Sequence, residues 1–282
     1  MKCDWNAFLK MLPQWMRTKV DMIGKEGLQE IRLRIGQPPQ LVMQNYSTLI
    51  DGIVSDEDLN FCINSASQYS PWSAPTVSCG YLTAPGGHRI GICGRMVISE
   101  GRIQTVRNVS SLCIRVARDF PGLGRQATGL KGSILIIGSP GRGKTTLLRD
   151  MIRQKTVIES ATVAVVDERG ELFPLVGGRF CFYPGSHTDV LSGCSKSKGI
   201  EILIRTMNPQ YVAVDEITAM EDCHAILQAR GCGVSILATA HAADIEDFKE
   251  RPVYKPILDG DIFPNIIVMQ PDKSWRLERT SV

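Results

Sequence analysis

An apolar run at residues 133–137 is followed by the glycine-rich segment Gly138-Ser139-Pro140-Gly141-Arg142-Gly143-Lys144-Thr145, and then by a stretch of helical composition at residues 144–154. The segment matches the pattern G-x-x-x-x-G-K-[ST], placed between a strand and a helix. Glycines let the backbone curl so that successive N–H groups point at one anion, and the N-terminus of the helix adds positive charge. The sequence therefore predicts a phosphate-binding loop here.

The side chains of this loop suit a nucleotide with a magnesium ion. Lys144 is expected to bridge the β- and γ-phosphates of ATP, while the Thr145 hydroxyl binds Mg²⁺. The residues expected to bind ATP are Gly138, Ser139, Pro140, Gly141, Arg142, Gly143, Lys144, Thr145 and Thr146. A chance match without a nucleotide role is the alternative, and the flanking strand and helix argue against it.

Two acids end a second apolar run, Tyr-Val-Ala-Val-Asp-Glu at residues 211–216. This is the form of a Walker B segment, in which Asp215 would hold the Mg²⁺ ion. Glu216 would orient and polarise the attacking water, a task suited to a carboxylate beside the γ-phosphate. Acids often end strands, so the pattern is weak alone, but it becomes a strong signal downstream of a complete phosphate-binding loop.

A third run, at residues 162–169, repeats the strand-then-acid form and ends in Asp167-Glu168-Arg169. Open parallel sheets bind ligands beyond the carboxyl ends of their strands, so this second carboxylate pair is expected at the same edge of the sheet. Glu168 could share or take over the activation of water, and Arg169 could bind phosphate or an acid. The alternative is an exposed, salt-bridged turn.

A fourth run, at residues 234–239, leads into Ala240-His241. Thr239 and His241 therefore stand at another strand's carboxyl end, where they could sense whether the γ-phosphate is present. A lone histidine is more often structural, and the sequence leaves both interpretations open.

The order of these runs predicts the fold. The second half alternates continuous apolar, β-branched runs with helical stretches, which is typical of a parallel sheet buried on both faces. The first half reads as short strands and turns, and the composition becomes rich in Pro and Gly at residues 119–130. We predict an α/β chain with a smaller α+β N-terminal domain at residues 1–128 and an ATPase domain with a mainly parallel sheet at residues 129–282.

Several elements can be placed within these domains. An amphipathic helix interrupted by Pro13 is expected at residues 5–23, a half-buried strand at residues 30–35 and a hairpin at residues 81–95. Residues 185–199 contain Gly, Ser and Lys and are expected to form a mobile loop over the nucleotide or at an interface. The strands expected in the parallel sheet lie at residues 133–137, 162–166, 211–214, 234–239 and 265–269.

Composition limits the possible partners. The chain has 282 residues, with 32 Lys and Arg against 29 Asp and Glu, so its net charge of +3 does not favour nucleic acid as a partner. Nine cysteines without a C-x-x-C pair favour a reduced cytoplasmic chain over a metal site or a disulfide framework. No apolar run approaches the roughly 18 residues that cross a bilayer, so no direct membrane span is expected.

Taken in order, the four segments resemble the Walker A, acidic box, Walker B and histidine box of the secretion and pilus-retraction ATPases. Within that superfamily, further stretches are similar to the sporulation stage III AA family, at residues 30–38, 143–150, 167–171, 188–196, 204–209 and 239–241. The resemblance covers most of the chain. Two residues depart from the pattern of this group. Thr218 stands where we would expect glycine, and Ala242 stands where glycine or threonine is commoner. These departures concern the backbone around Glu216 and His241 rather than the catalytic groups.

The resemblance implies a RecA-like ATPase domain behind a smaller N-terminal domain, assembled as a homo-oligomer, a hexameric ring. Such a ring would lie on the mother-cell side of the forespore membrane and energise a channel of membrane-embedded proteins. Nucleotides would lie at subunit interfaces, where arginines of a neighbour would stabilise the charge of the transition state. The unranked candidates, most of them expected to be solvated surface charges, are Arg32, Arg34, Arg95, Arg205 and Arg230.

Three alternatives share the phosphate-binding loop. A RecA-type nucleic-acid motor is disfavoured by the near-neutral charge and by the lack of a basic groove with aromatic side chains. A scaffold that binds ATP with little turnover is disfavoured by Glu216. A small-molecule kinase would need a lid and an acceptor site, neither of which is recognisable in the sequence.

Overall fold

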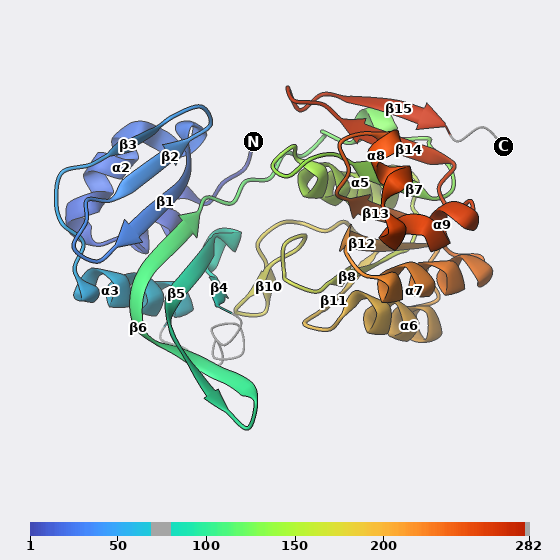
Figure 1. Cartoon of the computed structure of the whole chain (residues 1–282). Helices are drawn as coiled ribbons and strands as arrows, with labels where there is room; N and C mark the ends of the chain where they lie inside the picture. The colour runs from blue at the N-terminus through green and yellow to red at the C-terminus, as the bar shows by residue number, and fades with distance from the viewer. Residues whose placement is uncertain (69–79, 280–282) are drawn as a thin grey trace. The chain divides into compact units, whose positions relative to one another are not determined.

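The computed structural model describes residues 1–68 and 80–279 (Figure 1). The chain divides into two compact units, each of which is described by itself. Unit 1 consists of Met1–Asp119 and Pro174–Phe182, and unit 2 of Phe120–Phe173 and Tyr183–Val282. Residues 120–128, which composition placed in the N-terminal domain, belong to unit 2. They do so because the N–H groups of Gly122 and Gly124 donate to Oδ2 of the buried Asp150, at 3.0 and 2.7 Å.

Unit 1 contains an antiparallel sheet with the strand order β3-β2-β1-β6-β5-β4. The expected strand at residues 30–35 is β1, and β4 and β5 form the expected hairpin. The strands are β1 (Leu28–Arg34), β2 (Gln40–Met43), β3 (Ser47–Leu49), β4 (Tyr81–Thr83), β5 (Arg89–Ser99) and β6 (Arg102–Arg115). The inserted segment of unit 1 adds a ribbon of β9 (Leu175–Val176) and β10 (Arg179–Phe180).

Helices cover one face of this sheet. They are α1 (Trp5–Lys10), α2 (Gln14–Gly27) and α3 (Asp56–Ser67), with a short 3-10 turn at Pro85–Gly87. Pro13 separates α1 from α2, as predicted, and the fully buried Phe8, Leu12 and Met16 pack into the core of the unit. The apolar side of this helical segment therefore packs against the protein's own core.

Unit 2 contains the predicted mainly parallel sheet, with the order β11-β8-β12-β13-β7-β14-β15. All neighbouring pairs are parallel except β14 with β15. The five expected strands are confirmed as β7 (Ile134–Ile137), β8 (Val163–Asp167), β12 (Tyr211–Ile217), β13 (Ser235–Ala240) and β14 (Asn265–Met269). Their side chains are almost completely buried, which explains their continuous apolar sequences.

Two edge strands escaped prediction, β11 (Thr188–Ser192) and β15 (Trp275–Arg279). The expectation of a mobile loop at residues 185–199 was wrong, because β11 pairs with β8 and a helix begins at Lys196. An edge strand is partly exposed, so the short polar sequence of β11 lacks the apolar run that identified the central strands.

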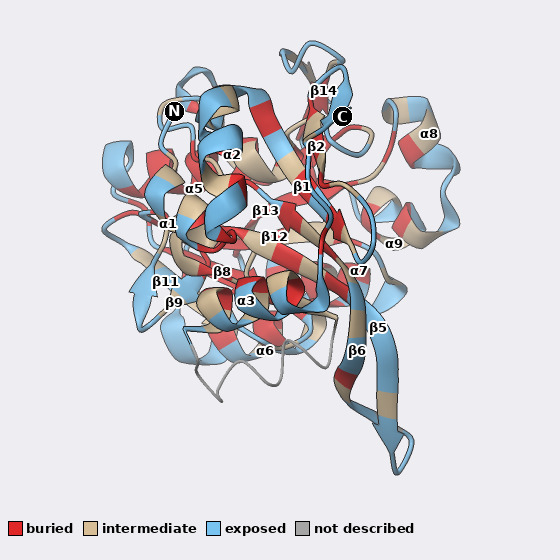
Figure 2. Cartoon of the chain, turned by 90° about the vertical axis from the view of Figure 1, so that its left-hand side faces the viewer, coloured by how far each residue is buried: buried red, intermediate tan, exposed pale blue. Residues whose placement is uncertain are grey.

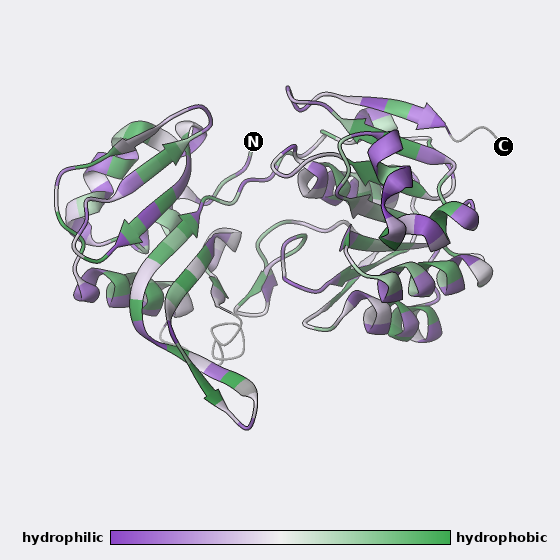
Figure 3. Ribbon diagram, viewed as in Figure 1, coloured by the Kyte–Doolittle hydropathy of each residue, from purple (hydrophilic) through white to green (hydrophobic). Residues whose placement is uncertain are grey.

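Helices lie on both faces of the parallel sheet. One face is covered by α5 (Lys144–Ile158), and the other by α6 (Lys196–Met207), α7 (Met220–Gly231) and α9 (Lys255–Asp259), with α8 (Ile245–Glu250) nearby. Short 3-10 turns occur at Arg125–Ala127 and Pro252–Tyr254. Buried residues concentrate in the strands (Figure 2), which are also the most hydrophobic segments (Figure 3). This layered core fixes the carboxyl ends of the strands, where the predicted site residues lie.

Candidate functional site

The loop between β7 and α5 contains the glycine-rich motif. Residues 138–143 form the turn between these elements. Gly143 has φ 95° and Gly141 has φ 76°, left-handed conformations that glycine adopts without strain. A Cβ on Gly138 would lie 2.8 Å from Cβ of Met269, so this position also requires glycine. The glycines of the motif are therefore needed for the backbone path of the loop.

Lys144 turns back into this loop. Its side chain is buried, and Nζ donates to the carbonyl oxygens of Gly138 and Ser139 at 2.7 and 3.1 Å. A third contact, at 3.0 Å, joins Nζ to Nδ1 of His241. Burial lowers the pKa of Lys144, and nearby carboxylates act in the opposite direction. The ammonium group is thus held where successive backbone N–H groups of the loop would bind phosphate.

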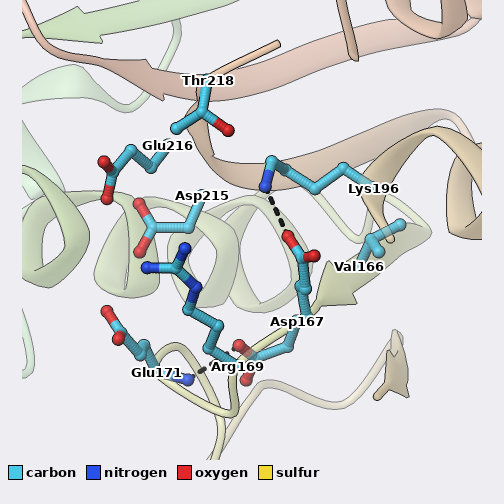
Figure 4. A pocket seen from close by; sticks show the side chains of 9 residues that line it. Val166, Asp167, Arg169, Glu171, Lys196, Asp215, Glu216 and Thr218 are labelled. Carbon is cyan, nitrogen blue, oxygen red and sulfur yellow. Dashed lines mark hydrogen bonds and ion pairs between the residues drawn. The ribbon is translucent and has the colours of Figure 1, made fainter. Parts of the chain in front are cut away.

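The end of β12 forms a β-bulge against β13. Asp215 and Glu216 together oppose the single residue Thr239. The N–H group of Glu216 donates to Oγ1 of Thr239 at 2.8 Å, and this hydroxyl donates to Oδ1 of Asp215 at 2.7 Å. Glu216 has φ 46°, a strained conformation for a residue with a Cβ atom. Because a bulge re-aims side chains, both consecutive acids line one pocket (Figure 4).

Asp215 also lies close to Thr145, the residue after the lysine of the loop. Burial raises the pKa of Asp215, while the hydroxyls of Thr239 and Thr145 act in the opposite direction. Among the described residues, no three His, Cys, Asp or Glu side chains gather as a metal cluster. A hydroxyl and one carboxylate nevertheless fit Mg²⁺, which is bound in nucleotide sites by few protein oxygens together with substrate phosphates.

His241 connects the lysine of the loop to the acid of the bulge. Its Nδ1 atom lies 3.0 Å from Nζ of Lys144, and its Nε2 atom lies 3.0 Å from Oε1 of Glu216. An ammonium can only donate, so Nδ1 is the acceptor, and Nε2 then carries the proton that it donates to Glu216. β13 lies between β7 and β12, which explains how His241 reaches both partners. The structure thus brings this predicted residue into the candidate site.

Asp167, at the end of β8, anchors a loop. Its buried carboxylate accepts hydrogen bonds from the N–H groups of Glu171, Leu172 and Phe173, at distances from 2.8 to 3.2 Å. Arg149 donates to the carbonyl oxygens of Leu172 and Glu171, at 2.6 and 2.7 Å. Burial raises the pKa of Asp167, although these N–H groups oppose the shift. Asp167 and Glu168, which the sequence suggested as a carboxylate pair, therefore have different roles, because Asp167 holds the loop in place.

We expect Asp167→Ala to lower the free energy of unfolding by about 3 kcal/mol, because each buried donor left without an acceptor costs roughly 1–3 kcal/mol. Chemical denaturation followed by circular dichroism measures this loss. Asp189→Ala, on an exposed position of β11, serves as the control and should change stability by less than about 0.5 kcal/mol. Equal losses for the two variants would contradict the anchoring role.

Glu168 forms an ion pair whose partner the sequence did not identify. Oε2 of Glu168 lies 2.5 Å from Nζ of Lys196, the first residue of α6. The expected alternative of an exposed, salt-bridged turn is thus half right, since Lys196 itself is buried. The pocket is lined by Val166, Asp167, Glu168, Arg169, Glu171, Lys196, Asp215, Glu216 and Thr218. It joins the carboxyl ends of β8 and β12, as expected for an open parallel sheet.

The other predicted residues lie in several places. Thr218, one of the two departures from the family pattern, lines the pocket, and its N–H group donates to Oδ2 of Asp222 at 3.1 Å. Arg205 pairs with Glu201 at 2.9 Å, in the last turn of α6. Arg230 is exposed in the last turn of α7. The first turns of α6 and α7 lie near the pocket, whereas Arg205 and Arg230 lie in the last turns. Within one chain these two arginines are therefore far from the site.

Two residues of the site were missed, Lys196 and Tyr254. The hydroxyl of Tyr254 donates to the carbonyl oxygens of His241 and Ile217, at 3.3 and 3.4 Å, and so links the ends of β13 and β12. Lys196 ends one of the stretches that resemble the family, but no chemical motif marks either residue as part of the site. Only the packing of α6 and of the turn at Pro252–Tyr254 brings them to the strand ends.

The parallel sheet with helices on both faces defines a RecA-like α/β fold, and an N-terminal domain precedes it. The structure is similar to the pilus retraction motor PilT with bound ADP (TM-score 0.64, 17% identity, covering 96% of this chain and 84% of that one). It is also similar to the ATPase DotB of Legionella pneumophila (TM-score 0.59, 16% identity, covering 95% and 80%). At these identities, the likeness shows the fold.

The chain belongs to the family described as sporulation stage III, protein AA, whose model matches residues 8–276. It is 32% identical to stage III sporulation protein AA of Bacillus subtilis (strain 168) over 284 aligned residues, covering 95% of this chain and 92% of that protein. The resemblance stated from the sequence is therefore confirmed. In the described part of the chain, none of the helices is long and apolar enough to cross a membrane.

Proposed function

We propose that this chain binds Mg-ATP at the carboxyl ends of β7, β12 and β13 and hydrolyses it. The observation that carries the proposal is the set of contacts from Lys144 through His241 to Glu216, with Asp215 and Thr145 beside it. This set combines a phosphate-binding lysine, two oxygen ligands for magnesium and a carboxylate for water, which are the parts that P-loop ATPases use.

Each side chain has a role in the proposed reaction. Lys144 and the backbone N–H groups of residues 138–146 other than Pro140 bind the β- and γ-phosphates, and Thr145 and Asp215 would hold Mg²⁺. When bound, the ion neutralises charge on the phosphate oxygens. Glu216 orients a water whose oxygen attacks the γ-phosphorus, and the bond to the β,γ-bridging oxygen breaks. ADP and inorganic phosphate leave, and the proton of the water passes to the carboxylate or to the released phosphate.

His241 is proposed to sense the γ-phosphate. In the structure Lys144 donates to Nδ1 of His241, a contact that competes with phosphate for the same ammonium group. When Lys144 turns to phosphate, His241 loses this partner but keeps its contact with Glu216. The occupancy of the phosphate site would thus be transmitted to the carboxylate that handles water.

We further propose that the chain serves spore formation as a cytoplasmic, membrane-associated motor. It would act as a homo-oligomer, a hexameric ring, on the mother-cell side of the forespore membrane, and energise a channel of membrane-embedded proteins. The sporulation relative in Bacillus subtilis and the likeness to a pilus retraction motor support this role. In such a ring, an arginine of a neighbouring subunit would complete the site, and the unranked candidates are Arg32, Arg34, Arg95, Arg205 and Arg230.

Turnover should rise more steeply than protein concentration. If a neighbour supplies an arginine, the isolated chain binds ATP but hydrolyses it slowly, and a finger of this kind is worth about 10³-fold or more in rate. Steady-state phosphate release measured over a wide range of protein concentrations tests the proposal. A strictly linear dependence down to the monomer would rule out the ring, and ATP binding without turnover at any concentration would favour a scaffold.

A further inference from the structure

Lys196 occupies a position that local rules disfavour. It is the first residue of α6, where the partial positive charge of the helix N-terminus repels a cation, and the first turn of this helix contains no acid. The lysine is also buried, with 7% of its surface exposed. A buried charge is tolerated only when it is paired. Sequences usually depart from such local preferences at functional sites, so the position of Lys196 suggests a function at the pocket.

The partners of Lys196 come from two different strand ends. Nζ lies 2.5 Å from Oε2 of Glu168, which follows β8, and 3.8 Å from Oδ2 of Asp222 in the first turn of α7. Asp222 accepts hydrogen bonds from the N–H groups of Thr218 and Ala219, directly after β12, at 3.1 and 3.3 Å. Lys196 therefore links the loop that carries Glu168 to the segment that follows Glu216.

A close helix–strand contact holds Lys196 at this distance. A Cβ on Gly199, one turn along α6, would lie 2.5 Å from Cγ1 of Val166. The absence of a side chain at Gly199 lets α6 approach β8 directly beside Glu168. The position of Nζ is thus set by packing rather than by a flexible surface side chain.

The ion pair between Lys196 and Glu168 lies in a pocket with several charged side chains. Glu168, Glu171, Asp215 and Glu216 all line it together with Arg169, so several carboxylates share the pocket with two cations. Of the two carboxylate oxygens of Glu168, Lys196 contacts only Oε2, and in the part of the chain that the structure describes Oε1 makes no hydrogen bond. The lysine can therefore hold one oxygen of the carboxylate while the other stays available to a ligand in the pocket.

We propose that Lys196 is a positioning residue for ATP hydrolysis, which holds Glu168 by one oxygen so that the other acts beside Glu216 on the attacking water. The link to Asp222 makes this position depend on the segment after β12. The inference rests on the proposed ATPase function and assigns Lys196 no direct contact with the nucleotide.

The test is a double-mutant cycle of Lys196→Met and Glu168→Gln, with the rate of hydrolysis and the affinity for fluorescent Mg-ATP measured separately on the full chain. We expect Lys196→Met to lower kcat by about 10–100-fold, because misplacement by about 1 Å costs up to 10²-fold, while ATP affinity stays within about threefold. Lys196→Arg, which keeps the charge, should recover part of the loss. Single-turnover assays with enzyme in excess give the residual rates.

Matched variants separate positioning from a structural role. Lys198→Met removes an exposed lysine of the same helix, whose side chain is 64% exposed and pairs with Glu201, and should leave kcat unchanged. In the Glu168→Gln background, Lys196→Met should change the rate by less than about twofold, because its partner carboxylate is gone. Lys196→Gln provides a second neutral variant should the methionine variant fail to fold, as checked by thermal unfolding.

Each outcome is decisive. An equal loss in both backgrounds, a loss confined to ATP affinity, or a Glu168→Gln variant with parental turnover overturns the positioning role. If the parent binds ATP but shows no turnover, the proposed function fails and the inference fails with it. If the parent hydrolyses ATP and Lys196→Met matches it, the inference alone fails.

Discussion

Lys144→Ala should weaken the binding of Mg-ATP by about 10–100-fold, because a charge-assisted hydrogen bond is worth roughly 1.5–3 kcal/mol. Turnover should fall by a further factor of about 10²–10³, as observed when a donor aimed at developing charge is removed. The physical reason is the buried position of the ammonium group at the mouth of the glycine loop, where Nζ already contacts two carbonyl oxygens and His241.

Isothermal titration with a non-hydrolysable ATP analogue and Mg²⁺ measures the first effect, and phosphate release measures the second. Lys131→Ala is the matched control, since this exposed lysine precedes β7 at the opposite end of the strand. It should bind and hydrolyse like the parent. Because Lys144 also holds loop carbonyls, thermal unfolding must show that its variant is folded. A folded Lys144→Ala variant with parental affinity would refute the phosphate role.

The sequence predicted those parts of the site that depend on short-range pattern. The glycine loop follows β7, and Asp215 and Glu216 lie at the end of β12. Both strands are buried on both faces, so each one is a continuous apolar run in the sequence. A parallel sheet gathers such strand ends at one edge, and the contact between His241 and both Lys144 and Glu216 follows from the strand order.

Features that depend on tertiary packing could not be predicted. The hydroxyl of Thr239 braces the bulge of β12, which becomes evident only from the register of β12 against β13. Asp167 and Glu168 are chemically similar neighbours, yet the fold buries one under loop N–H groups and pairs the other with Lys196. The edge strand β11 has too little buried surface to leave an apolar pattern. Burial and register, rather than residue type, separate these roles.

Glu216→Gln is expected to lower kcat by about 10²–10⁴-fold while the affinity for Mg-ATP stays within about threefold, as for the loss of a positioned general base. The substitution keeps an oxygen that can accept the hydrogen bond from Nε2 of His241, so the geometry of the site is retained. The strained φ of 46° at Glu216 supports a functional role, since such conformations cost of order 1–3 kcal/mol and cluster at active sites.

Comparison with Glu168→Gln decides which carboxylate activates water. Glu221→Gln, at an exposed position in the first turn of α7, is the control and should retain parental turnover. If Glu216→Gln alone abolishes turnover and binding survives, Glu216 is the base, and the small effect of Glu168→Gln also contradicts the proposal for Lys196. If both variants lose turnover, the two carboxylates act together, as the shared pocket suggests. If only Glu168→Gln is inactive, Glu168 is the base, and the bulge holds Glu216 for its contact with His241.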